Sequence, residues 1–424
     1  MARKMKNSGL QWIEDIPIEW EVKRLKYAAL EFGKGSGITK EDVFEDGDVP
    51  CVRYGEIYSR YDNTFTECYS KTKKRINKSP HYFGKGDILF AGTGELVEEI
   101  GKNIVYMGDI PCMAGGDIII MKHNQNPVFL NYALISNYAQ AQKSKGKAKL
   151  KVVHISPTDI KNILLILPPR QEQDSIALFL DNKCNEIDRL VGDLEAEVKI
   201  LTDYKKSIIA EAVFHGLDSL VSQKKTELGW IDNIPEHWEI ARIASVYTVR
   251  SVKVSDKVYK PLSVTMKGIV PQLESAAKTK NGDERKLIRK GDFVINSRSD
   301  RRGSCGISDY DGSCSLINTV LAPREEMNPR YYNWLFHTTQ FADEFYKWGY
   351  GIADDLWTTN WGAMRRIQIP MPPIDEQIAI ANYLDVKCKE IEETIVEKRQ
   401  QIEKIKDYKA SLIYEYVTGK KQVV

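Results

Sequence analysis

Clustered basic side chains are the residues of this sequence whose types and spacing point most directly to chemistry. The first part of the chain contains Lys71, Lys73, Lys74, Arg75, Lys145, Lys147 and Lys149. The later part contains Lys278, Lys280, Arg285, Arg298, Arg301 and Arg302. Lysine ammonium groups neutralise phosphates without reading base sequence, whereas an arginine on a Gly/Ser loop suits the O6 and N7 atoms of guanine. We therefore predict that these residues bind double-stranded DNA, although any single cluster is also compatible with a solubilising surface.

No catalytic or metal site can be assigned from the sequence. The glycine-rich run 33–37 lacks the Gly-Lys-Ser/Thr ending of a phosphate-binding loop, so it is expected to be a flexible loop. The stretch 283–286 contains a fragment of a nuclease metal site, but no suitable aspartate on a strand precedes it. The six histidines show no metal-ligand spacing. We therefore predict that the chain is not an enzyme and has neither a metal nor a cofactor of its own.

Length and composition limit the class of protein. A chain of 424 residues is long for one domain, and its 42% hydrophobic and 28% charged residues are typical of a soluble globular protein. No apolar run approaches the length of a membrane span, and residues 1–9 lack the apolar core of a secretory signal. The seven cysteines contain no Cys-x-x-Cys pair, which favours reduced thiols. These features predict a cytoplasmic protein.

A long helix is predicted to begin near Pro168-Pro169 and to end near Gly216. Its apolar residues recur at heptad positions over about five heptads, which is typical of a helix packed lengthwise on another helix. The predicted seam contains Leu180, Ile187, Val191, Leu194, Val198, Leu201 and Ile208. About 44 residues at 1.5 Å each make a rod of roughly 65 Å, which needs a partner along its apolar face.

The partner is encoded later in the same chain. The opening at Pro372-Pro373 repeats the first at a constant offset of 204 residues, and the matching continues for about forty residues. The second seam contains Leu384, Ile391, Ile395, Ile402, Ile405 and Leu412. Lys398 and Lys409 also fall on seam positions, where either they extend to a neighbouring carboxylate or the seam loosens.

A second repeat precedes each globular part of the chain. Residues 10–21 and 228–239, called here the anchor segments, share the pattern Trp-Ile-x-x-Ile-Pro-x-x-Trp. Two tryptophans around a conformationally restricted Ile-Pro are expected to make a rigid extended segment. We predict that each anchor segment covers a hydrophobic edge of the domain that follows it, and that neither binds a ligand.

The globular parts mix short strands and helices. In the first, residues 49–57, 87–91, 102–107 and 117–122 are predicted as strands and residues 127–142 as a helix. In the second, Lys290-Gly291-Asp292 repeats Lys85-Gly86-Asp87, and residues 328–347 are predicted as a helix. The fold class is therefore mixed α/β or α+β. The predicted divisions are 1–166 and 218–370 for globular domains with their anchor segments, and 167–217 and 371–424 for helices.

Charge is divided unevenly between these parts. Residues 21–166 carry 21 basic and 17 acidic side chains, and residues 239–369 carry 20 and 15. The helical stretch 170–218 carries 6 basic and 11 acidic side chains, and 374–417 carries 7 and 10. Basic globular parts favour a polyanion as their partner, and acidic helices favour a protein partner. A solvated helix is, however, also often rich in glutamate.

The duplicated order of these motifs resembles the DNA-specificity subunits of type I restriction–modification enzymes. The resemblance is carried by the two anchor segments, the Lys-Gly-Asp strands and the Pro-Pro-x-x-Glu-Gln openings followed by heptads, and it covers essentially the whole chain. Glu172-Gln173 and Glu376-Gln377 match the helix openings of that family. Gly86-Asp87 and Gly291-Asp292 match its recognition-domain strand.

The resemblance implies a non-catalytic subunit with an internal pseudo-twofold repeat. Each globular part would be a target recognition domain that reads one half of a bipartite, asymmetric DNA sequence. The two helices would pair antiparallel as a spacer that fixes the gap and would dock two methyltransferase subunits. Those subunits would carry S-adenosylmethionine, and separate restriction subunits that translocate DNA would use ATP and Mg²⁺.

Two other classes of function remain open at this point. One is a DNA methyltransferase or nuclease whose active-site motif is not recognisable in the sequence. The other is a coiled-coil scaffold without a DNA role, which predicts binding that is insensitive to salt. Phosphate neutralisation instead gives a steep fall of affinity with salt concentration.

Overall fold

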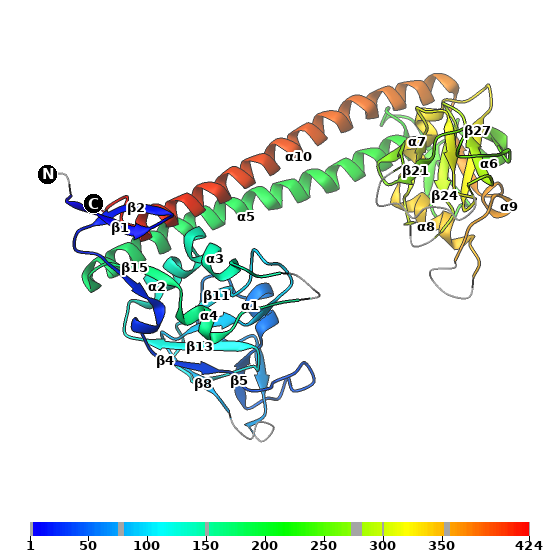
Figure 1. Ribbon diagram of the computed structural model, residues 1–424. Helices are drawn as coiled ribbons and strands as arrows, with labels where there is room; N and C mark the ends of the chain where they lie inside the picture. Colours follow the sequence, from blue (N-terminus) through cyan, green and yellow to red (C-terminus); the bar gives the residue numbers. More distant parts are fainter. Residues whose placement is uncertain are drawn as a thin grey trace. The chain divides into compact units, whose positions relative to one another are not determined.

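The computed structural model describes residues 3–74, 80–148, 152–272, 282–298, 301–351 and 357–423. The chain forms two compact units. Unit 1 comprises residues 1–195 with 400–424, and unit 2 comprises residues 196–399. Each unit combines a globular α/β part with half of each of two long helices (Figure 1). The predicted mixed fold class with two long helices is therefore confirmed.

Two sheets form the globular part of unit 1. The five-stranded sheet has the order β4 (Ala29–Lys34), β13 (Ile118–His123), β9 (Ile88–Ala91), β11 (Asn103–Tyr106) and β6 (Thr64–Phe65). The four-stranded sheet has the order β7 (Ser70–Thr72), β5 (Val49–Val52), β12 (Cys112–Ala114) and β8 (Tyr82–Phe83). The pairs β11–β6 and β12–β5 are parallel, and the other pairs are antiparallel. Every residue of β9 and β11 is buried, so both faces of these central strands are covered.

Short helices and two-stranded ribbons complete unit 1. The helices are η1 (Leu25–Tyr27), α1 (Tyr54–Ser59), α2 (Pro127–Ile135), α3 (Asn137–Ser144) and α4 (Pro157–Lys161). The ribbons pair β1 (Met5–Leu10) with β2 (Ile13–Pro17), β10 (Thr93–Gly94) with β14 (Val153–His154), and β3 (Glu21–Arg24) with β15 (Leu164–Leu167).

Unit 2 is built from smaller sheets. A four-stranded sheet has the order β19 (Tyr247–Val249), β27 (Asn318–Pro323), β24 (Phe293–Asn296) and β25 (Cys305–Ile307). A three-stranded sheet has the order β20 (Lys253–Val254), β23 (Arg285–Ile288) and β26 (Gly312–Cys314). Two-stranded ribbons are β21 (Leu262–Thr265) with β22 (Gly268–Pro271), β16 (Gln223–Lys225) with β17 (Asn233–Pro235), and β18 (Glu239–Arg242) with β28 (Gln368–Met371). Its short helices are α6 (Ile243–Val246), α7 (Pro329–Phe336), α8 (Thr339–Lys347) and α9 (Trp361–Met364).

Three predicted elements differ from the observed ones. The strand expected over 49–57 ends at Val52, and α1 follows it. The helix expected over 127–142 is broken at Ser136, and the helix expected over 328–347 is broken at His337-Thr338. At both breaks a hydroxyl, that of Ser136 or Thr338, donates to the carbonyl three residues earlier. These local side-chain bonds compete with continuation of the helix.

The two ends of each globular domain pair with each other. In unit 1, β3 pairs antiparallel with β15, and Glu21 lies opposite Leu167. In unit 2, β18 pairs antiparallel with β28, and Glu239 lies opposite Met371. Each pair closes its domain immediately before a long helix begins, so the same junction is built twice from residues that the sequence repeats.

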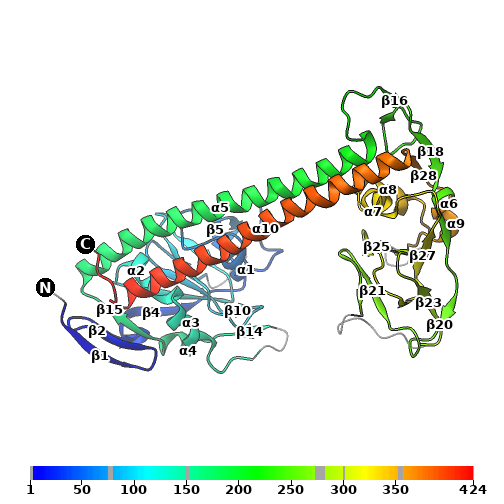
Figure 2. The same ribbon diagram turned by 90° about the horizontal axis from the view of Figure 1, so that it is seen from above.

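Within each unit, the long helices α5 (Arg170–His215) and α10 (Ile374–Val417) lie side by side and antiparallel (Figure 2). In unit 1, Asp188 pairs with Lys409 at 2.6 Å and Glu195 with Lys406 at 3.5 Å. In unit 2, Glu197 pairs with Lys398 and Lys205 with Glu392. In both units a higher number on α5 meets a lower number on α10, which defines the antiparallel direction.

The lysines at seam positions extend to carboxylates of the facing helix. Lys398 reaches Glu197 and Lys409 reaches Asp188, with the lysine side chains about one quarter exposed. Their aliphatic stems cover apolar surface while the ammonium groups remain at the edge of the seam. Of the two possibilities that the sequence left open, the structure therefore shows the first.

The predicted seam residues differ in burial along the helices. Leu180, Ile187, Leu384, Ile391, Ile395, Ile402 and Leu412 are buried, whereas Val191, Leu194, Val198, Leu201, Ile208 and Ile405 are partly buried. The first part of α5, with Leu180 and Ile187, belongs to the same core as Phe129 and Tyr132 of α2. Leu180 and Ile187 are therefore covered by α2 as well as by the facing helix, which explains why they are buried more fully than the later seam residues of α5.

Candidate nucleic-acid interface

The repeated pattern within the anchor segments holds each domain to the start of a long helix. Trp20 is fully buried, and its indole N–H donates to Glu172 Oε2 at 2.8 Å. In unit 2, the indole N–H of buried Trp238 donates to Glu376 Oε2 at 2.9 Å. Since the two glutamates belong to the repeated Pro-Pro-x-x-Glu-Gln openings, the repeated motifs contact each other.

Electrostatics strengthen the first of these junctions. Arg3 donates to both carboxylate oxygens of Glu172, and its guanidinium lies over the Trp20 ring at 5.5 Å. Burial raises the pKa of Glu172, but the hydrogen bonds from Arg3 and Trp20 outweigh burial and hold the pKa below its ordinary value. The carboxylate therefore stays ionised as the centre of a charge-assisted network.

The glutamine of each opening joins the helix to a loop of the domain. Gln173 Nε2 donates to the Pro168 carbonyl at 2.9 Å, and its Oε1 accepts from the Asn126 N–H at 3.0 Å. Gln377 makes the equivalent bonds with Pro372 and Asn328, at 2.8 and 2.9 Å. Asn126 and Asn328 each cap the next helix of the domain, so the repeated residues position the globular part on the rod.

The anchor segments mostly cover hydrophobic edges, as the sequence predicted. Ile16 and Trp20 lie in the core of unit 1, and Ile234 and Trp238 lie in the core of unit 2. Trp12 is an exception, because 43% of its surface is exposed.

The Lys-Gly-Asp repeat forms a turn. Gly86 and Gly291 have φ of 85° and 91°, a region that glycine adopts without strain. The Asp87 carboxylate accepts from the Gly84 N–H at 2.8 Å, and the Asp292 carboxylate accepts from the Arg289 N–H at 2.8 Å. The repetition of this motif is therefore explained by turn geometry.

The first predicted lysine cluster lies on and after β7. Lys71 and Lys74 are exposed, whereas Lys73 is partly buried and pairs with Asp46 at 2.7 Å. Lys73 also lies over the Phe44 ring at 5.0 Å. Arg75 lies outside the described residues.

The second predicted cluster follows α3. Lys145 is exposed, and Lys147 is partly buried and pairs with Asp159 at 2.8 Å. Lys149 lies outside the described residues. The adjacent Lys143 is buried, donates to the Gly101 carbonyl at 2.9 Å, and has its pKa lowered to about 7 by burial. It therefore supports the fold and offers no ammonium group to a ligand.

The basic residues predicted in unit 2 occupy different environments. Arg285 is 4% exposed, and its guanidinium donates to the hydroxyl and carbonyl oxygens of Ser313. This is a correction, because a side chain held inside β23 and β26 is not presented to DNA. Arg298 is partly buried, and Arg301 is exposed. Lys278 and Lys280 lie outside the described residues.

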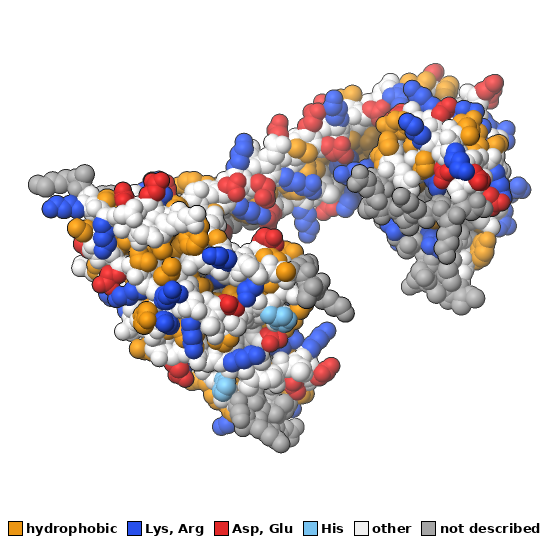
Figure 3. Space-filling model, viewed as in Figure 1, with side chains coloured by type: hydrophobic (Ala, Val, Ile, Leu, Met, Phe, Trp, Pro, Cys, Tyr) orange, Lys and Arg blue, Asp and Glu red, His pale blue; other side chains and the backbone are white. Residues whose placement is uncertain are grey.

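Arg302 is exposed, with 51% of its side-chain surface accessible. It pairs with Asp343 of α8 and lies over the Tyr346 ring at 5.7 Å. DNA binding through Arg302 would therefore exchange an intramolecular ion pair for a contact with the duplex. On the face drawn in Figure 3, Lys and Arg side chains are scattered over both globular parts, with acidic side chains among them.

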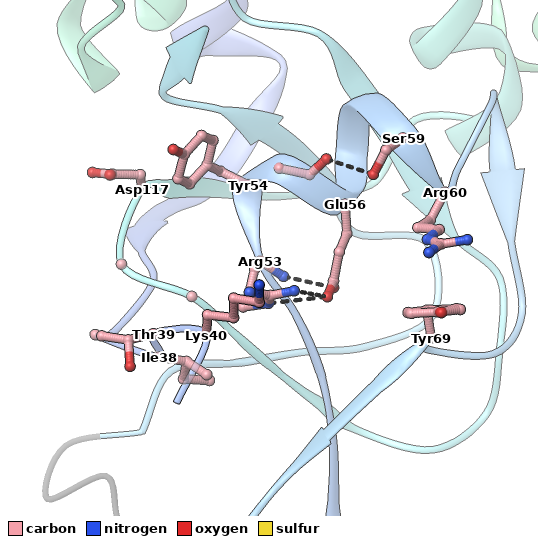
Figure 4. Close-up of a pocket in the computed structure, with 14 residues that line it drawn as sticks. Ile38, Thr39, Lys40, Arg53, Tyr54, Glu56, Ser59, Arg60, Tyr69 and Asp117 are labelled. Atoms are coloured by element: carbon pink, nitrogen blue, oxygen red, sulfur yellow. Dashed lines mark hydrogen bonds and ion pairs between the residues drawn. The ribbon is translucent and has the colours of Figure 1, made fainter. Parts of the chain in front are cut away.

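Sequence reasoning missed a group of side chains that unit 1 brings together around one cavity. Arg53 lies between β5 and α1, Arg60 follows α1, and Tyr69 precedes β7 (Figure 4). The available signal was the interleaving of arginine and tyrosine between residues 53 and 69. In the described part of the chain, no group of His, Cys, Asp or Glu residues is arranged to hold a metal ion. No described helix has the length and apolar character that crossing a membrane requires.

Comparisons with known proteins agree with this architecture. Residues 17–199 match the family described as the type I restriction modification DNA specificity domain. The putative type I restriction enzyme MjaX specificity subunit of Methanocaldococcus jannaschii is 26% identical, over 97% of this chain and 96% of its own length. The type I restriction enzyme MjaVIII specificity subunit of the same organism is 23% identical, over 96% of this chain and 94% of its own length.

A solved structure from a study of complex assembly and conformational transition of the type I restriction–modification system has the same fold. Its TM-score is 0.72 at 16% identity, over 96% of this chain and 99% of that chain. The fold and the comparisons therefore confirm the resemblance to type I restriction–modification DNA-specificity subunits that was predicted from the sequence. Subunits of this class are not catalytic, and the comparisons give no support to the methyltransferase, nuclease or scaffold alternatives.

Proposed function

We propose that the two globular domains each read one half of a bipartite, asymmetric DNA target and that α5 and α10 set the gap between the halves. The observation that carries this proposal is the duplicated junction. Each domain is closed by an equivalent strand pair and is fixed to a helix by the same tryptophan–glutamate bond. Within each unit the two helices run antiparallel, which is the direction that a twofold axis between two repeated halves would require. Dimeric DNA readers use such an axis to address two half-sites at a fixed spacing.

The two domains are expected to read different bases. Their frames repeat, but the side chains on their surfaces differ. Unit 1 offers Arg53, Arg60 and lysines after β7, whereas unit 2 offers Arg298, Arg301 and Arg302 on the connection between β24 and β25. Lysines and arginines both contact phosphates, and arginine in addition suits the O6 and N7 atoms of guanine. Two different reading surfaces on one repeated frame produce an asymmetric target.

A test of this proposal is to map methylated adenines in a host that lacks other adenine methylation. Cells expressing the chain with its methyltransferase partner are expected to show one motif of two specified halves separated by an unspecified gap of constant length. Cells expressing the partner alone are expected to show none. Methylation without this chain, or a single uninterrupted motif, would contradict the proposal. Binding of the assembled complex to DNA should also weaken steeply as salt rises.

Two exposed positions on the helices support docking of two methyltransferase subunits. In unit 1, Tyr408 of α10 is 59% exposed and lies close to the ion pair between Lys183 and Glu186. The hydrogen bond from Lys183 to Glu186, at 2.8 Å, raises the pKa of Lys183, and Tyr408 adds to that effect. Tyrosine is enriched among the residues that contribute most of the binding energy in protein–protein interfaces.

Unit 2 contains the same surface in the repeated positions. Tyr204 of α5 is 51% exposed and lies close to Lys387 and Glu390, which pair at 2.8 Å. Packing of the seam explains why buried positions recur at the offset of 204 residues, but it does not explain a recurring exposed tyrosine. We propose that the Tyr204 and Tyr408 surfaces each dock one methyltransferase subunit.

Substitution of Tyr204 by alanine is expected to remove one docked subunit, because its exposed ring contributes little to the fold and much to an interface. Native mass spectrometry of the purified complex should change from two methyltransferase subunits per chain to one. Tyr204→Ala with Tyr408→Ala should leave none. Ile200→Ala is the matched control, since Ile200 is 66% exposed on the same helix and its counterpart in the repeat is Lys404. Two subunits retained by the double variant would rule out these surfaces.

The remaining chemistry is proposed to reside in the partners. S-adenosylmethionine would be bound by the methyltransferase subunits, and ATP and Mg²⁺ by the restriction and translocase subunits. This chain would then supply target choice and geometry. Since its proposed substrate is host and foreign DNA, we propose that it acts in the cytoplasm.

A further inference from the structure

A cavity of about 730 Å³ opens on the globular part of unit 1 (Figure 4). It is lined by residues that follow β5, by α1 and by the loop after β12, and none of its charged side chains was assigned a role from the sequence. Its walls carry Lys40, Arg53, Tyr54, Arg60, Tyr69 and Asp117. Four glycines complete the lining, so parts of the wall are bare backbone that a planar ligand can approach closely.

The Arg53 guanidinium is held in one orientation by Glu56. Arg53 Nε and Nη2 lie 3.0 and 2.9 Å from Glu56 Oε1, and Glu56 Oε2 accepts the Arg53 backbone N–H at 3.0 Å. The Ser70 hydroxyl also donates to Glu56 at 2.5 Å. Glu56 is 4% exposed, so this carboxylate is committed to holding the arginine. The Arg53 side chain itself is 27% exposed.

The geometry of this pairing leaves part of the arginine available. A guanidinium carries five N–H donors in a rigid fork. Glu56 engages the side formed by Nε and Nη2, so the end formed by Nη1 and the outer hydrogen of Nη2 keeps its donors. An arginine fixed in this way loses little side-chain entropy when it forms two parallel hydrogen bonds with a ligand.

A second arginine is ordered on the same cavity. The Arg60 guanidinium lies over the Tyr69 ring, 4.1 Å from its centroid, and Tyr69 is 62% exposed. Figure 4 shows the two groups stacked face to face. Among the described residues, Arg60 has no carboxylate partner. Stacking fixes the plane of the guanidinium while its N–H donors remain open to a ligand.

The charge of the cavity favours a polyanion with acceptor groups. Lys40, Arg53 and Arg60 are its cations, and Glu56 is already engaged by Arg53. Asp117 is the remaining carboxylate of the lining and is exposed. The paired N–H donors of an arginine, with the Asp117 carboxylate as an acceptor, match the major-groove edge of a G·C pair. On that edge guanine presents the acceptors O6 and N7, and cytosine presents its amino group as a donor.

We infer that this cavity is the base-reading site of the first domain and that Arg53 reads a guanine of the first half-site. The inference rests on the proposed function and specifies which side chains perform it. Arg53 is the specificity-determining residue, Glu56 is a positioning residue, and Arg60 reads or clamps an adjacent nucleotide. Lys71 and Lys74, which lie outside the cavity, contact phosphates and do not choose bases.

The test is a methylation map of cells in which the chain carries Arg53→Lys. Lysine keeps the charge but loses the fork, so choice at a single base pair of the first half-site should relax about tenfold or more. Glu56→Gln, which releases Arg53 without removing it, should relax the same position. Arg24→Lys is the matched control, because Arg24 is an exposed arginine of unit 1 that donates to Asn162 outside the cavity. It should leave the map unchanged.

The methylation map of wild-type cells separates failure of this inference from failure of the proposed function. If the wild-type map has no bipartite motif, the proposed function fails. If that motif exists, the inference is overturned by unchanged base choice in Arg53→Lys, or by an equal loss of methylation at all sites. Should Arg53→Lys not fold, Glu56→Gln carries the same test, because it keeps the volume of the Glu56 side chain and removes the charge that fixes the Arg53 guanidinium. Tight binding of free guanosine monophosphate with an unchanged map would instead assign a nucleotide site and would also overturn the inference.

Discussion

Inserting one heptad into each long helix is expected to lengthen the gap between the two half-sites by about three base pairs. Seven residues add about 10.5 Å to an α-helix, and one base pair occupies about 3.4 Å of duplex. Duplicating residues 191–197 in α5 and 400–406 in α10 places the two insertions opposite each other, because Glu195 faces Lys406. A whole heptad keeps the apolar seam in register.

The methylation map measures this result directly. The bases of both half-sites should stay unchanged, since neither domain is altered. Three base pairs also rotate the duplex by about 100° at 10.5 base pairs per turn, so methylation at the new sites should be less complete than at the original ones.

Two outcomes decide whether the helices determine the spacing. A heptad inserted into α5 alone is the control, because it separates Asp188 from Lys409 or Glu197 from Lys398 and should abolish methylation. An unchanged gap in the double insertion would show that the spacing is set elsewhere in the complex.

Substitution of Trp20 by alanine is expected to produce the largest loss of stability. Trp20 is fully buried among residues of the anchor segment, the first domain and α5. Removing a buried tryptophan costs about 3–5 kcal/mol, and Glu172 also loses the indole donor. For a unit of this size, the midpoint of thermal unfolding should fall by roughly 10 °C.

Calorimetry of the purified chain measures this effect, and a second tryptophan of the same segment is the control. Trp12 is 43% exposed, so Trp12→Ala should lower the midpoint by about 1–2 °C. Trp20→Phe should fall between the two variants, because it retains much of the packing and loses the bond to Glu172. Equal melting of Trp20→Ala and Trp12→Ala would contradict the role assigned to the junction.

Local patterns in the sequence were sufficient to predict the two long helices and the internal repeat. The heptads predicted α5 and α10, and the constant offset between the two Pro-Pro-x-x-Glu-Gln openings predicted that the frame is built twice. A seam depends on side-chain spacing within one helix, so it can be read without knowledge of the rest of the fold. The repeat similarly indicated that Trp20 and Trp238 have equivalent roles, although not that they bond to Glu172 and Glu376.

Only the tertiary structure decided which polar side chains are available for binding. Arg285 and Lys143 belong to basic clusters in the sequence, yet β26 encloses the first and the Gly101 and Asn103 oxygens hold the second inside the domain. Burial of a charged group depends on which distant strands pair beside it, and this information is absent from its neighbours in sequence.

Tertiary structure also decided that Arg53 is available for binding, although the sequence had not marked it as a candidate. The lining of the cavity around Arg53 comes from separate stretches of chain that the pairing of β5 with β7 and β12 brings together. In sequence, the signal at Arg53 was the interleaving of arginine and tyrosine between residues 53 and 69, which does not show that these side chains meet around one cavity. Long-range strand pairing gives Arg53 a buried carboxylate partner and an open cavity, because sheet contacts join residues according to register and not according to their distance along the chain.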